Sequence, residues 1–300
     1  MSHDRDQFTF DNPVTRYARV EPPLQHQPEP GVQADMTPVP DLGEKTYRGL
    51  GRLTGRKALI TGGDSGIGGA VAIAFAREGA DVAIVHLPDE QRDADHILEQ
   101  IRDAGRTGVS IATDITDPGA CRELVSHAAE ALGGLDIVVN NAGKQVMVEK
   151  VDDLSDEQFE QTFRTNVFAP FWITKAALAH LPEGGTIINT ASLEAYVPAP
   201  DRLDYAATKA AINNLSKGLA QQLASRGIRV NVVAPGPTWS ALQVSQGVSD
   251  DQMEHFDDES TYQRAGQPAE IAPAFVFLAS AESSYVSGET LNVNGGMVTP

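Results

Sequence analysis

The stretch KALITGGDSGIG, residues 57–68, decides the fold of this chain. It begins with the apolar run 58–60, passes through a turn rich in glycine, and leads into a helical pattern of apolar residues that reaches residue 75. Glycines permit a tight turn in which the backbone approaches a phosphate closely, and the N-terminus of a helix offers free N–H groups and a partial positive charge. The stretch therefore predicts a strand, a phosphate-binding turn and a helix, although such a turn can also merely pack a helix on a strand.

Outward from this turn, short apolar runs alternate with helical patterns along the rest of the chain. We expect further strands at 82–85, 108–113, 135–139, 186–188, 228–233 and 290–294, and further helices at 89–103, 118–131, 155–179, 203–226 and 268–280. Short apolar runs separated by helices are typical of a parallel sheet buried on both faces. The expected fold is a single-domain, Rossmann-type doubly wound α/β sheet with helices on both faces and ligands at the carboxyl ends of its strands.

The first 50 residues differ in composition from the rest. They hold seven of the 18 prolines, together with scattered charges and no helical or strand period. Such a segment cannot bury enough apolar surface by itself to offset the entropy that it loses on ordering. We expect residues 1–50 to form an extended, proline-rich arm, either disordered or lying across a neighbouring subunit, and residues 51–300 to form the Rossmann-type domain.

Composition narrows the classes of partner. The chain has 41 acidic and 23 basic side chains, which gives a formal net charge of −18. A surface this negative repels phosphate backbones and anionic lipids, so nucleic acid and membrane are not expected as partners.

Cys121 is the only cysteine, which excludes an internal disulfide and a cysteine-based zinc site, and no other spacing indicates a catalytic metal. Residues 1–10 lack the apolar core of a secretory signal, and we expect a cytoplasmic protein.

The residues Gly-Asp-Ser-Gly at 63–66 also surround the nucleophile of trypsin-like serine proteases. Those enzymes are all-β, bring a histidine and an aspartate from elsewhere in the chain, and usually carry disulfides. This chain alternates strands with helices, has one cysteine, and places Ser65 at the start of a helix. The protease interpretation is therefore set aside.

A set of motifs carries a family resemblance. The motifs are the turn at 61–68, Asn-Asn-Ala-Gly at 140–143, Ser192, the pair Tyr205 and Lys209, and Pro235-Gly236. In this order and spacing they resemble the short-chain dehydrogenase/reductase family, between about residue 55 and residue 298. The stretches 141–145, 234–239 and 264–268 resemble a bacterial branch with long N-terminal arms, which includes NADPH-dependent aldehyde reductases and enzymes like glucose/ribitol dehydrogenase.

Tyr205 and Lys209 have the residue types and spacing for proton transfer. They stand four apart in an expected helix, so both side chains project from one face. A free phenol, with a pKa near 10, is a weak acid for catalysis at neutral pH, and a nearby ammonium favours the phenolate and lowers the pKa. The resemblance implies that Tyr205 is the general acid and base and that Lys209 also holds the nicotinamide ribose. Taken alone, such a pair is more often plain surface spacing.

Two further side chains complete the implied catalytic set. Ser192 follows an expected strand, where its hydroxyl can hold the substrate oxygen beside the tyrosine; the alternative is a serine that caps a turn. Asn166 matches the family asparagine that positions a water beside the lysine; the alternative is an asparagine whose amide is satisfied by helix packing. The resemblance also implies a set of contacts to the dinucleotide: Gly62, Asp64, Ser65, Gly66, Ile67, Gly68, His86, Asp114, Ile115, Asn141, Ala142, Gly143, Tyr205, Lys209, Pro235, Gly236 and Thr238.

The choice between the two dinucleotides depends on the end of the second strand. Family members that prefer NAD carry an acid there, and this chain has His86, so the main barrier to NADP is absent. No arginine or lysine at 64, 65 or 87 is present to bind the 2′-phosphate, and Asp64 is mildly unfavourable. We expect NADP(H) to be favoured over NAD(H), with dual use possible.

The acidic stretch 238–263 has two interpretations, a cover over the substrate pocket or a solvated charged helix, and the second is favoured.

The expected reaction is reduction of an aldehyde or ketone, or oxidation of the corresponding alcohol or sugar. The resemblance implies that the protein is a homotetramer. Two alternatives stay open: an epimerase or dehydratase on the same fold, and a dinucleotide-binding regulator without activity. The substrate itself does not follow from the sequence.

Overall fold

The computed structural model describes residues 6–299 and places one seven-stranded sheet at the centre of the molecule. The strands are β1 (Lys57–Thr61), β2 (Asp81–His86), β3 (Gly108–Ala112), β4 (Ile137–Asn140), β5 (Thr186–Thr190), β6 (Arg229–Pro235) and β7 (Thr290–Val293). All run parallel, in the order β3-β2-β1-β4-β5-β6-β7. The expected doubly wound sheet is confirmed. Each expected strand is present, and β5 and β6 extend beyond their expected ends.

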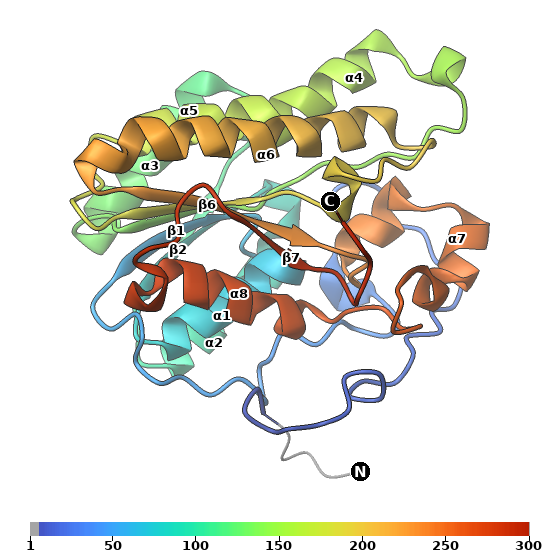
Figure 1. Cartoon of the computed structure of the whole chain (residues 1–300), viewed down its shortest axis with the longest axis horizontal. Helices are drawn as coiled ribbons and strands as arrows, with labels where there is room; N and C mark the ends of the chain where they lie inside the picture. Colours follow the sequence, from blue (N-terminus) through green and yellow to red (C-terminus); the bar gives the residue numbers. More distant parts are fainter. Residues whose placement is uncertain (1–5, 300) are drawn as a thin grey trace.

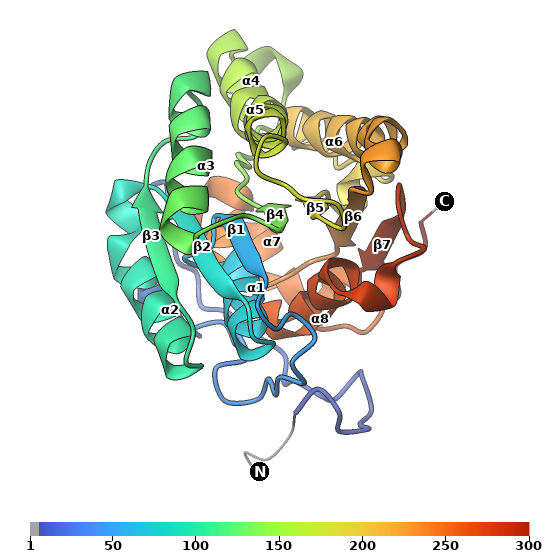
Figure 2. The same ribbon diagram turned by 90° about the vertical axis from the view of Figure 1, so that its left-hand side faces the viewer.

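Helices cover both faces of the sheet (Figures 1 and 2). One face carries α1 (Gly66–Arg77), α2 (Gln91–Asp103) and α8 (Pro268–Ala279), and the other carries α3 (Pro118–Leu132), α4 (Asp156–Phe163), α5 (Ala169–Ala177) and α6 (Leu203–Leu223). Successive side chains of a strand point to opposite faces, so Leu59 packs into one apolar core and Ile60 into the other. Because both cores exclude water, the central strands are continuous apolar runs.

The expected helix 155–179 is divided into three pieces. α4 ends at Phe163, residues Arg164–Phe168 form a π-helical turn, and α5 follows from Ala169. A π turn accommodates one extra residue and is frequent at functional sites. Because the apolar period hardly changes across such a turn, the sequence pattern gave no sign of it. The turn carries Asn166 into the interior, where the residue is 3% exposed.

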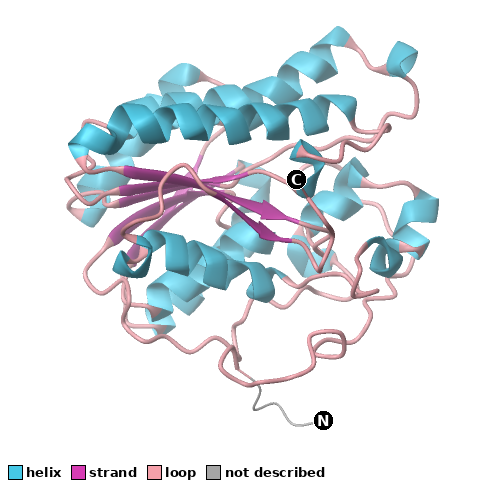
Figure 3. Cartoon of the chain, viewed as in Figure 1, coloured by secondary structure: helices cyan, strands magenta, loops and turns pink. Residues whose placement is uncertain are grey.

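The N-terminal arm, residues 6–50, lies against its own chain, an arrangement that neither expectation for it included (Figures 1 and 3). The remaining arm residues, 1–5, fall outside the described residues. The arm contacts a segment at residues 238–265, here called the lid segment, which contains α7 (Asp250–Glu254). The indole Nε1 of Trp239 donates to Pro38 O at 2.7 Å, and the backbone N–H of Gln27 donates to Val244 O at 2.9 Å.

Arm and lid segment share a small apolar core of their own. Val20 and Met36 of the arm pack with Trp239 and Phe256 of the lid segment, whose ring centroids lie 5.7 Å apart. An isolated arm would not bury enough apolar surface to become ordered, but the lid segment supplies the missing surface. The two segments lie far apart in the sequence: Pro38 and Trp239 are separated by 201 residues. The lid segment in turn depends on the arm for part of its burial.

The acidic stretch 238–263 is not a solvated helix throughout. α7 is short, and Asp257 beyond it is 2% exposed. Its carboxylate accepts hydrogen bonds from the backbone N–H of Glu21 at 2.8 Å and of Ala265 at 2.7 Å. This acid therefore joins the arm to the lid segment.

Among the described residues, no helix has both the length and the apolar character needed to cross a membrane.

A buried carboxylate fixes the end of the arm to α1. The Glu78 side chain has no exposed surface, and it accepts hydrogen bonds from Arg52 Nε at 3.0 Å and Tyr47 Oη at 2.8 Å. The backbone N–H groups of Leu50 and Arg52 also donate to it, each at 2.9 Å. A buried charge with this many donors is costly to disrupt, because removing it leaves the donors unpaired.

We expect Glu78→Ala to lower the free energy of unfolding by about 3 kcal/mol or more, measured by urea denaturation. The matched control is Glu282→Ala, since Glu282 contacts the same Arg52 at 3.6 Å but is 55% exposed. Exposed pairs contribute about 1 kcal/mol at most. Equal effects of the two substitutions would show that the Glu78 carboxylate is not an anchor.

Candidate active site

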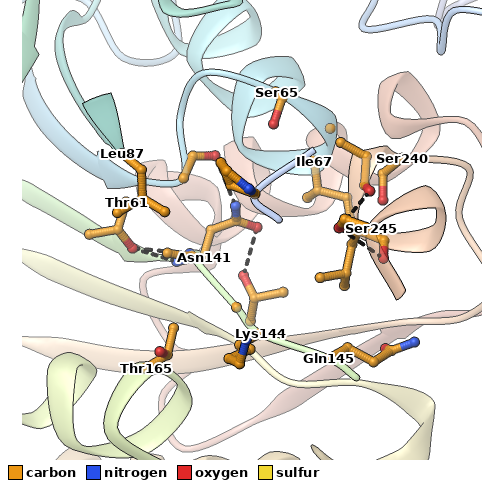
Figure 4. Close-up of a pocket in the computed structure, with 18 of the residues that line it drawn as sticks. Thr61, Ser65, Ile67, Leu87, Asn141, Lys144, Gln145, Thr165, Ser240 and Ser245 are labelled. Carbon is orange, nitrogen blue, oxygen red and sulfur yellow. Dashed lines mark hydrogen bonds between the residues drawn. The ribbon is translucent and has the colours of Figure 1, made fainter. Parts of the chain in front are cut away.

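A cavity of about 350 Å³ opens at the carboxyl ends of the central strands (Figure 4). Thr61 at the end of β1, Asn141 after β4, Ala191 after β5 and Pro235 at the end of β6 all line it. The chain reverses its direction of sheet building between β1 and β4, and ligands of open α/β sheets bind in the crevice at that point. The cavity therefore lies where the fold predicts a ligand.

The glycine turn has the shape of a phosphate cradle. Gly62 and Gly66 have φ angles of +61° and +49°, in the left-handed region that favours glycine. A Cβ added at Gly68 would lie 1.8 Å from Gly62 O, so Gly68 keeps the helix close to the turn. Without side chains at these positions, the N-terminus of α1 faces the cavity. The N–H of Gly66 donates to Gln33 Oε1 of the arm at 2.8 Å, so a pyrophosphate would be held by the other N–H groups of the first helical turn and by the helix dipole.

Almost all the residues predicted to contact a dinucleotide line this one cavity. They are Gly62, Asp64, Ser65, Gly66, Ile67, His86, Asp114, Ile115, Asn141, Ala142, Gly143, Tyr205, Lys209, Pro235, Gly236 and Thr238. The exception is Gly68, which packs behind the turn as described above. The predicted catalytic Ser192 also lines the cavity, whereas Asn166 lies behind its wall.

Tyr205 and Lys209 lie together on α6, with Lys209 Nζ 5.3 Å from the centroid of the Tyr205 ring. Both are buried, at 7% and 4% exposure. Lys209 Nζ donates to Thr190 O at 3.0 Å, which holds the ammonium beneath the phenol. The expected proximity of phenol and ammonium is therefore present.

The pKa of Tyr205 is not lowered, contrary to the expectation from its neighbouring lysine. Burial, reinforced by the negative charge of Glu194, raises the pKa of Tyr205 above its ordinary value, and the hydrogen bond with Ser192 offsets only part of this. Burial lowers the pKa of Lys209 to about 8. The loss of water around both groups outweighs the favourable charge of Lys209, and this loss of water arises only in the folded chain.

Ser192 caps a turn, as one of the two interpretations expected, and it also lies at the phenol of Tyr205, where the other role stays a prediction. Its hydroxyl accepts a hydrogen bond from the backbone N–H of Glu194 at 3.1 Å, which caps the short helical turn Leu193–Ala195. The same hydroxyl hydrogen-bonds with Tyr205. A serine in this position can hold a substrate oxygen beside the phenol while the turn fixes its own orientation.

The amide of Asn166 is fully satisfied by the protein. Its Oδ1 accepts from the backbone N–H of Lys144 at 2.7 Å, and its Nδ2 donates to Lys144 O at 2.9 Å and Thr208 Oγ1 at 3.0 Å. The side chain therefore ties the π turn to the loop after β4. These are the contacts that the packing interpretation expects, and they fix Lys144 at the cavity wall; the water-positioning role of Asn166 stays a prediction.

The end of the cavity near the end of β2 is lined by His86 and by two acids, Asp64 and Glu90. His86 cannot readily bind a phosphate, because its two ring nitrogens contact Ser110 Oγ at 2.7 Å and Leu87 O at 2.8 Å. Asp64 is 1% exposed, and its Oδ2 has no hydrogen-bond partner within the protein. Glu90 Oε2 accepts from Leu87 N at 2.7 Å. Burial raises the pKa of Asp64, with a smaller contribution from the charge of Asp93, and burial together with the charge of Asp64 raises the pKa of Glu90.

Several lining residues were missed from the sequence: Glu29, Pro30, Glu90, Lys144, Gln145, Gln161, Thr165, Ser240, Ala241, Leu242, Gln243 and Ser245. Lys144 directly follows the Asn-Asn-Ala-Gly motif, and Glu90 ends the helical turn after β2, so local sequence could have indicated both. Nothing local indicates Glu29, because the arm reaches the cavity only through tertiary packing. Within residues 6–299, no group of three or more His, Cys, Asp or Glu side chains is arranged to hold a metal ion.

Glu194 was also missed, and it acts from behind the wall. Its carboxylate lies 3.3 Å from Arg202 Nε, and one of its oxygens is buried without a hydrogen-bond partner. Burial raises the pKa of Glu194 to about 7. Its charge in turn raises the pKa values of Tyr205 and Lys209, so the protonation of all three groups is linked.

Comparison with known proteins agrees with this geometry. A family model described as Enoyl-(Acyl carrier protein) reductase matches residues 62–298. The uncharacterized oxidoreductase YghA of Escherichia coli (strain K12) is 56% identical over 296 residues, 99% of each chain. The glucose and ribitol dehydrogenase of Daucus carota is 43% identical, over 92% of this chain and 97% of that protein.

Solved structures show the same fold. A short chain dehydrogenase from Burkholderia cenocepacia J2315, in complex with NADP, is 38% identical with a TM-score of 0.75, over 82% of this chain and 98% of the other. The motif order, the parallel sheet, the cavity and these relatives agree. This chain belongs to the short-chain dehydrogenase/reductase family of oxidoreductases.

Proposed function

We propose that the protein reduces an aldehyde or ketone with NADPH or NADH, or oxidises the corresponding alcohol or sugar, with Tyr205 as general acid and base. The observation that carries this proposal is the meeting of Tyr205, Lys209 and Ser192 in the cavity that the glycine turn also lines. A regulator that only senses a dinucleotide needs the turn but not this trio.

A bound reduced nicotinamide would supply the hydride. Ser192 holds the carbonyl oxygen, and its hydroxyl bears part of the negative charge that develops there. Tyr205 donates its phenolic proton to the same oxygen. The raised pKa of Tyr205 keeps the phenol protonated at neutral pH, which is the form that reduction requires. Lys209 lies beneath the ring and stabilises the phenolate that remains after transfer.

We expect Tyr205→Phe to lower kcat by at least about 100-fold, because general acid catalysis contributes about this much or more. Dinucleotide binding, measured by fluorescence titration, should be retained. The matched control is Tyr196→Phe, since Tyr196 accepts a hydrogen bond from Asn213 at 3.0 Å and lies outside the cavity lining. Turnover is followed by the absorbance of the reduced cofactor on a panel of aldehydes, ketones and sugars. Full activity of the Tyr205 variant would overturn its role, and turnover without net absorbance change would indicate an epimerase or dehydratase.

NADP(H) is proposed as the favoured cofactor, with dual use possible. Two features support this choice: β2 ends in His86 rather than an acid, and the related dehydrogenase of Burkholderia cenocepacia J2315 was solved with NADP. The nearby carboxyls of Asp64 and Glu90 oppose a 2′-phosphate only when ionised. Since burial raises both pKa values, they retain protons at a higher pH than ordinary acids do.

The preference for NADPH over NADH should therefore fall as pH rises, because each carboxyl that loses its proton repels the 2′-phosphate. The measurement is the ratio of kcat/KM for the two cofactors across pH 6 to 9 (about the range in which raised carboxyl pKa values lie). Glu90→Gln should raise the ratio at high pH and flatten its pH dependence, which separates the effect from titration of the phosphate itself. Asp89→Asn, an exposed neighbour, is the control. Parallel pH profiles for wild type and Glu90→Gln would contradict the explanation.

A homotetramer is proposed, supported by an apolar stripe on α4, the π turn and α5. Phe159, Phe168 and Phe171 are each more than 40% exposed. Phe159 stacks on Phe163 at 4.9 Å, and Phe168 lies 5.9 Å from Trp172, so the rings form a continuous surface. Exposed aromatic clusters of this kind mark protein interfaces.

We expect Phe168→Glu to reduce the oligomer to a smaller species, because it places a charge in the centre of the apolar stripe. Analytical ultracentrifugation measures the change. Phe10→Glu is the control, since Phe10 is fully exposed but lies on the arm, away from the stripe. An unchanged assembly of the Phe168 variant would mean that this stripe is not the subunit interface.

A further inference from the structure

Two side chains in the cavity, Glu29 and Lys144, form an ion pair that the proposed reaction does not use. Lys144 Nζ lies 2.6 Å from Glu29 Oε1, across a sequence separation of 115 residues. Both residues line the cavity that also holds Tyr205 and Lys209. Lys144 comes from the loop after β4, and Glu29 comes from the arm. The arm is therefore part of the wall of the site.

The position of Lys144 is fixed by the catalytic framework. Its backbone N–H and C=O are both hydrogen-bonded to the amide of Asn166. Its side chain is only 15% exposed, and Figure 4 places it among the lining residues, between Thr165 and Gln145. A largely desolvated ammonium in a cavity attracts anions strongly, since little water screens its charge. Glu29 is the acid that the structure pairs with it.

Lys209 does not take over this role. It is the other lysine in the cavity lining, which contains no arginine among the described residues, and its Nζ is held by Thr190 O at 3.0 Å beneath the phenol. Whether this end of the cavity presents a free cation to a substrate therefore depends on the pairing of Lys144 with Glu29.

The ion pair is not needed to hold the arm. The arm is bound independently by the hydrogen bond from Trp239 to Pro38 O, by the hydrogen bond from Gln27 to Val244 O, and by the packing of Met36. Glu29 itself is 37% exposed, and a pair exposed to this degree contributes little to stability. The position of the pair inside the cavity calls for an explanation other than anchoring.

Two of the relatives described above match different shares of this chain. YghA matches 99% of this chain, whereas the dehydrogenase from Burkholderia cenocepacia J2315 matches 82% of it and is itself covered almost completely. The uncovered fraction corresponds in size to the arm. Arm residue Glu29 lies in the cavity lining together with residues of the sheet domain.

We propose that Glu29 is a specificity-determining residue: by neutralising Lys144 it disfavours carbonyl substrates that carry a carboxylate and leaves the site selective for uncharged aldehydes, ketones or sugars. The substrate part of this inference rests on the proposed carbonyl reduction, but the charge balance of the cavity does not.

The first experiment compares two aldehydes of equal chain length, succinic semialdehyde, which is an anion, and butanal, which is neutral. The ratio of their kcat/KM values with NADPH is measured for wild type and Glu29→Gln. We expect the ratio to shift about five-fold or more toward the anion in Glu29→Gln, the effect of one unpaired charge a few ångströms away in a partly aqueous site. The matched control is Asp35→Asn, which removes an arm carboxylate that pairs with exposed Arg92 outside the cavity lining.

The second experiment does not depend on turnover. Ligand-observed NMR gives the dissociation constants of butyrate and butyramide for the enzyme, with and without NADPH. Glu29→Gln should bind butyrate more tightly by a similar factor while butyramide binding stays unchanged. Lys144→Gln should shift the ratio the opposite way, because it leaves Glu29 unpaired. The double variant should return the ratio close to that of wild type.

These readouts separate the two proposals. If wild type reduces neither aldehyde nor any other carbonyl tested, the proposed function fails, and the butyrate-to-butyramide ratio still decides the role of Glu29. If Glu29→Gln lowers the melting temperature but leaves both ratios unchanged, the pair is only a latch for the arm and the inference is overturned. An unchanged ratio in Lys144→Gln would overturn it equally.

Discussion

The site depends on a small set of hydrogen bonds at the reversal point of the sheet. Thr61 Oγ1, at the end of β1, accepts from the backbone N–H groups of Asn141 and Ala142, at 3.0 and 3.1 Å, and Asn141 Nδ2 donates to Gly62 O at 3.2 Å. Adjacent parallel strands diverge where their ladders end, and these bonds keep the glycine turn and the loop after β4 at a fixed separation. The lining residues at the ends of β5 and β6 are positioned relative to this junction, since these strands are built outward from β4.

Burial sets the pKa values of Tyr205 and Lys209 more than neighbouring charges do. Tyr205 and Lys209 both lose their water, so the pKa of the acid rises while the pKa of Lys209 falls to about 8. Glu194, with a pKa raised to about 7, acts on both groups through its charge. The phenol therefore keeps its proton, and the ammonium loses its own more easily than a solvated lysine. Near neutral pH it is therefore Lys209 and Glu194 that exchange protons most easily, while the phenol stays protonated.

The features that could be predicted from the sequence are those set by local patterns and by the order of motifs along the chain. The strands could be recognised because both faces of the sheet are buried, and most residues of the cavity lining because their motifs follow the strand ends. The sequence could not predict features that arise from packing between distant segments. The π turn at Asn166 leaves the apolar period nearly intact, and Glu29 reaches the cavity only after the arm has docked on the lid segment. The pKa of Tyr205 was misjudged for the same reason, since burial is a property of the folded chain. Gly68 is the one predicted dinucleotide contact outside the cavity lining, and a side chain there would collide with Gly62 O.

The arm also explains how the lid segment can be rich in acids and yet ordered. Residues such as Trp239 and Phe256 need an apolar partner, and the sheet domain is already covered by its own helices; Val20 and Met36 of the arm fill this need. Asp257 can then be buried, because the backbone N–H groups of Glu21 and Ala265 satisfy it. Arm and lid segment are therefore one structural unit, and residues of both line the cavity. A change in the arm can reach the cavity through this unit while the sheet and the packing of Tyr205 against Lys209 stay unchanged.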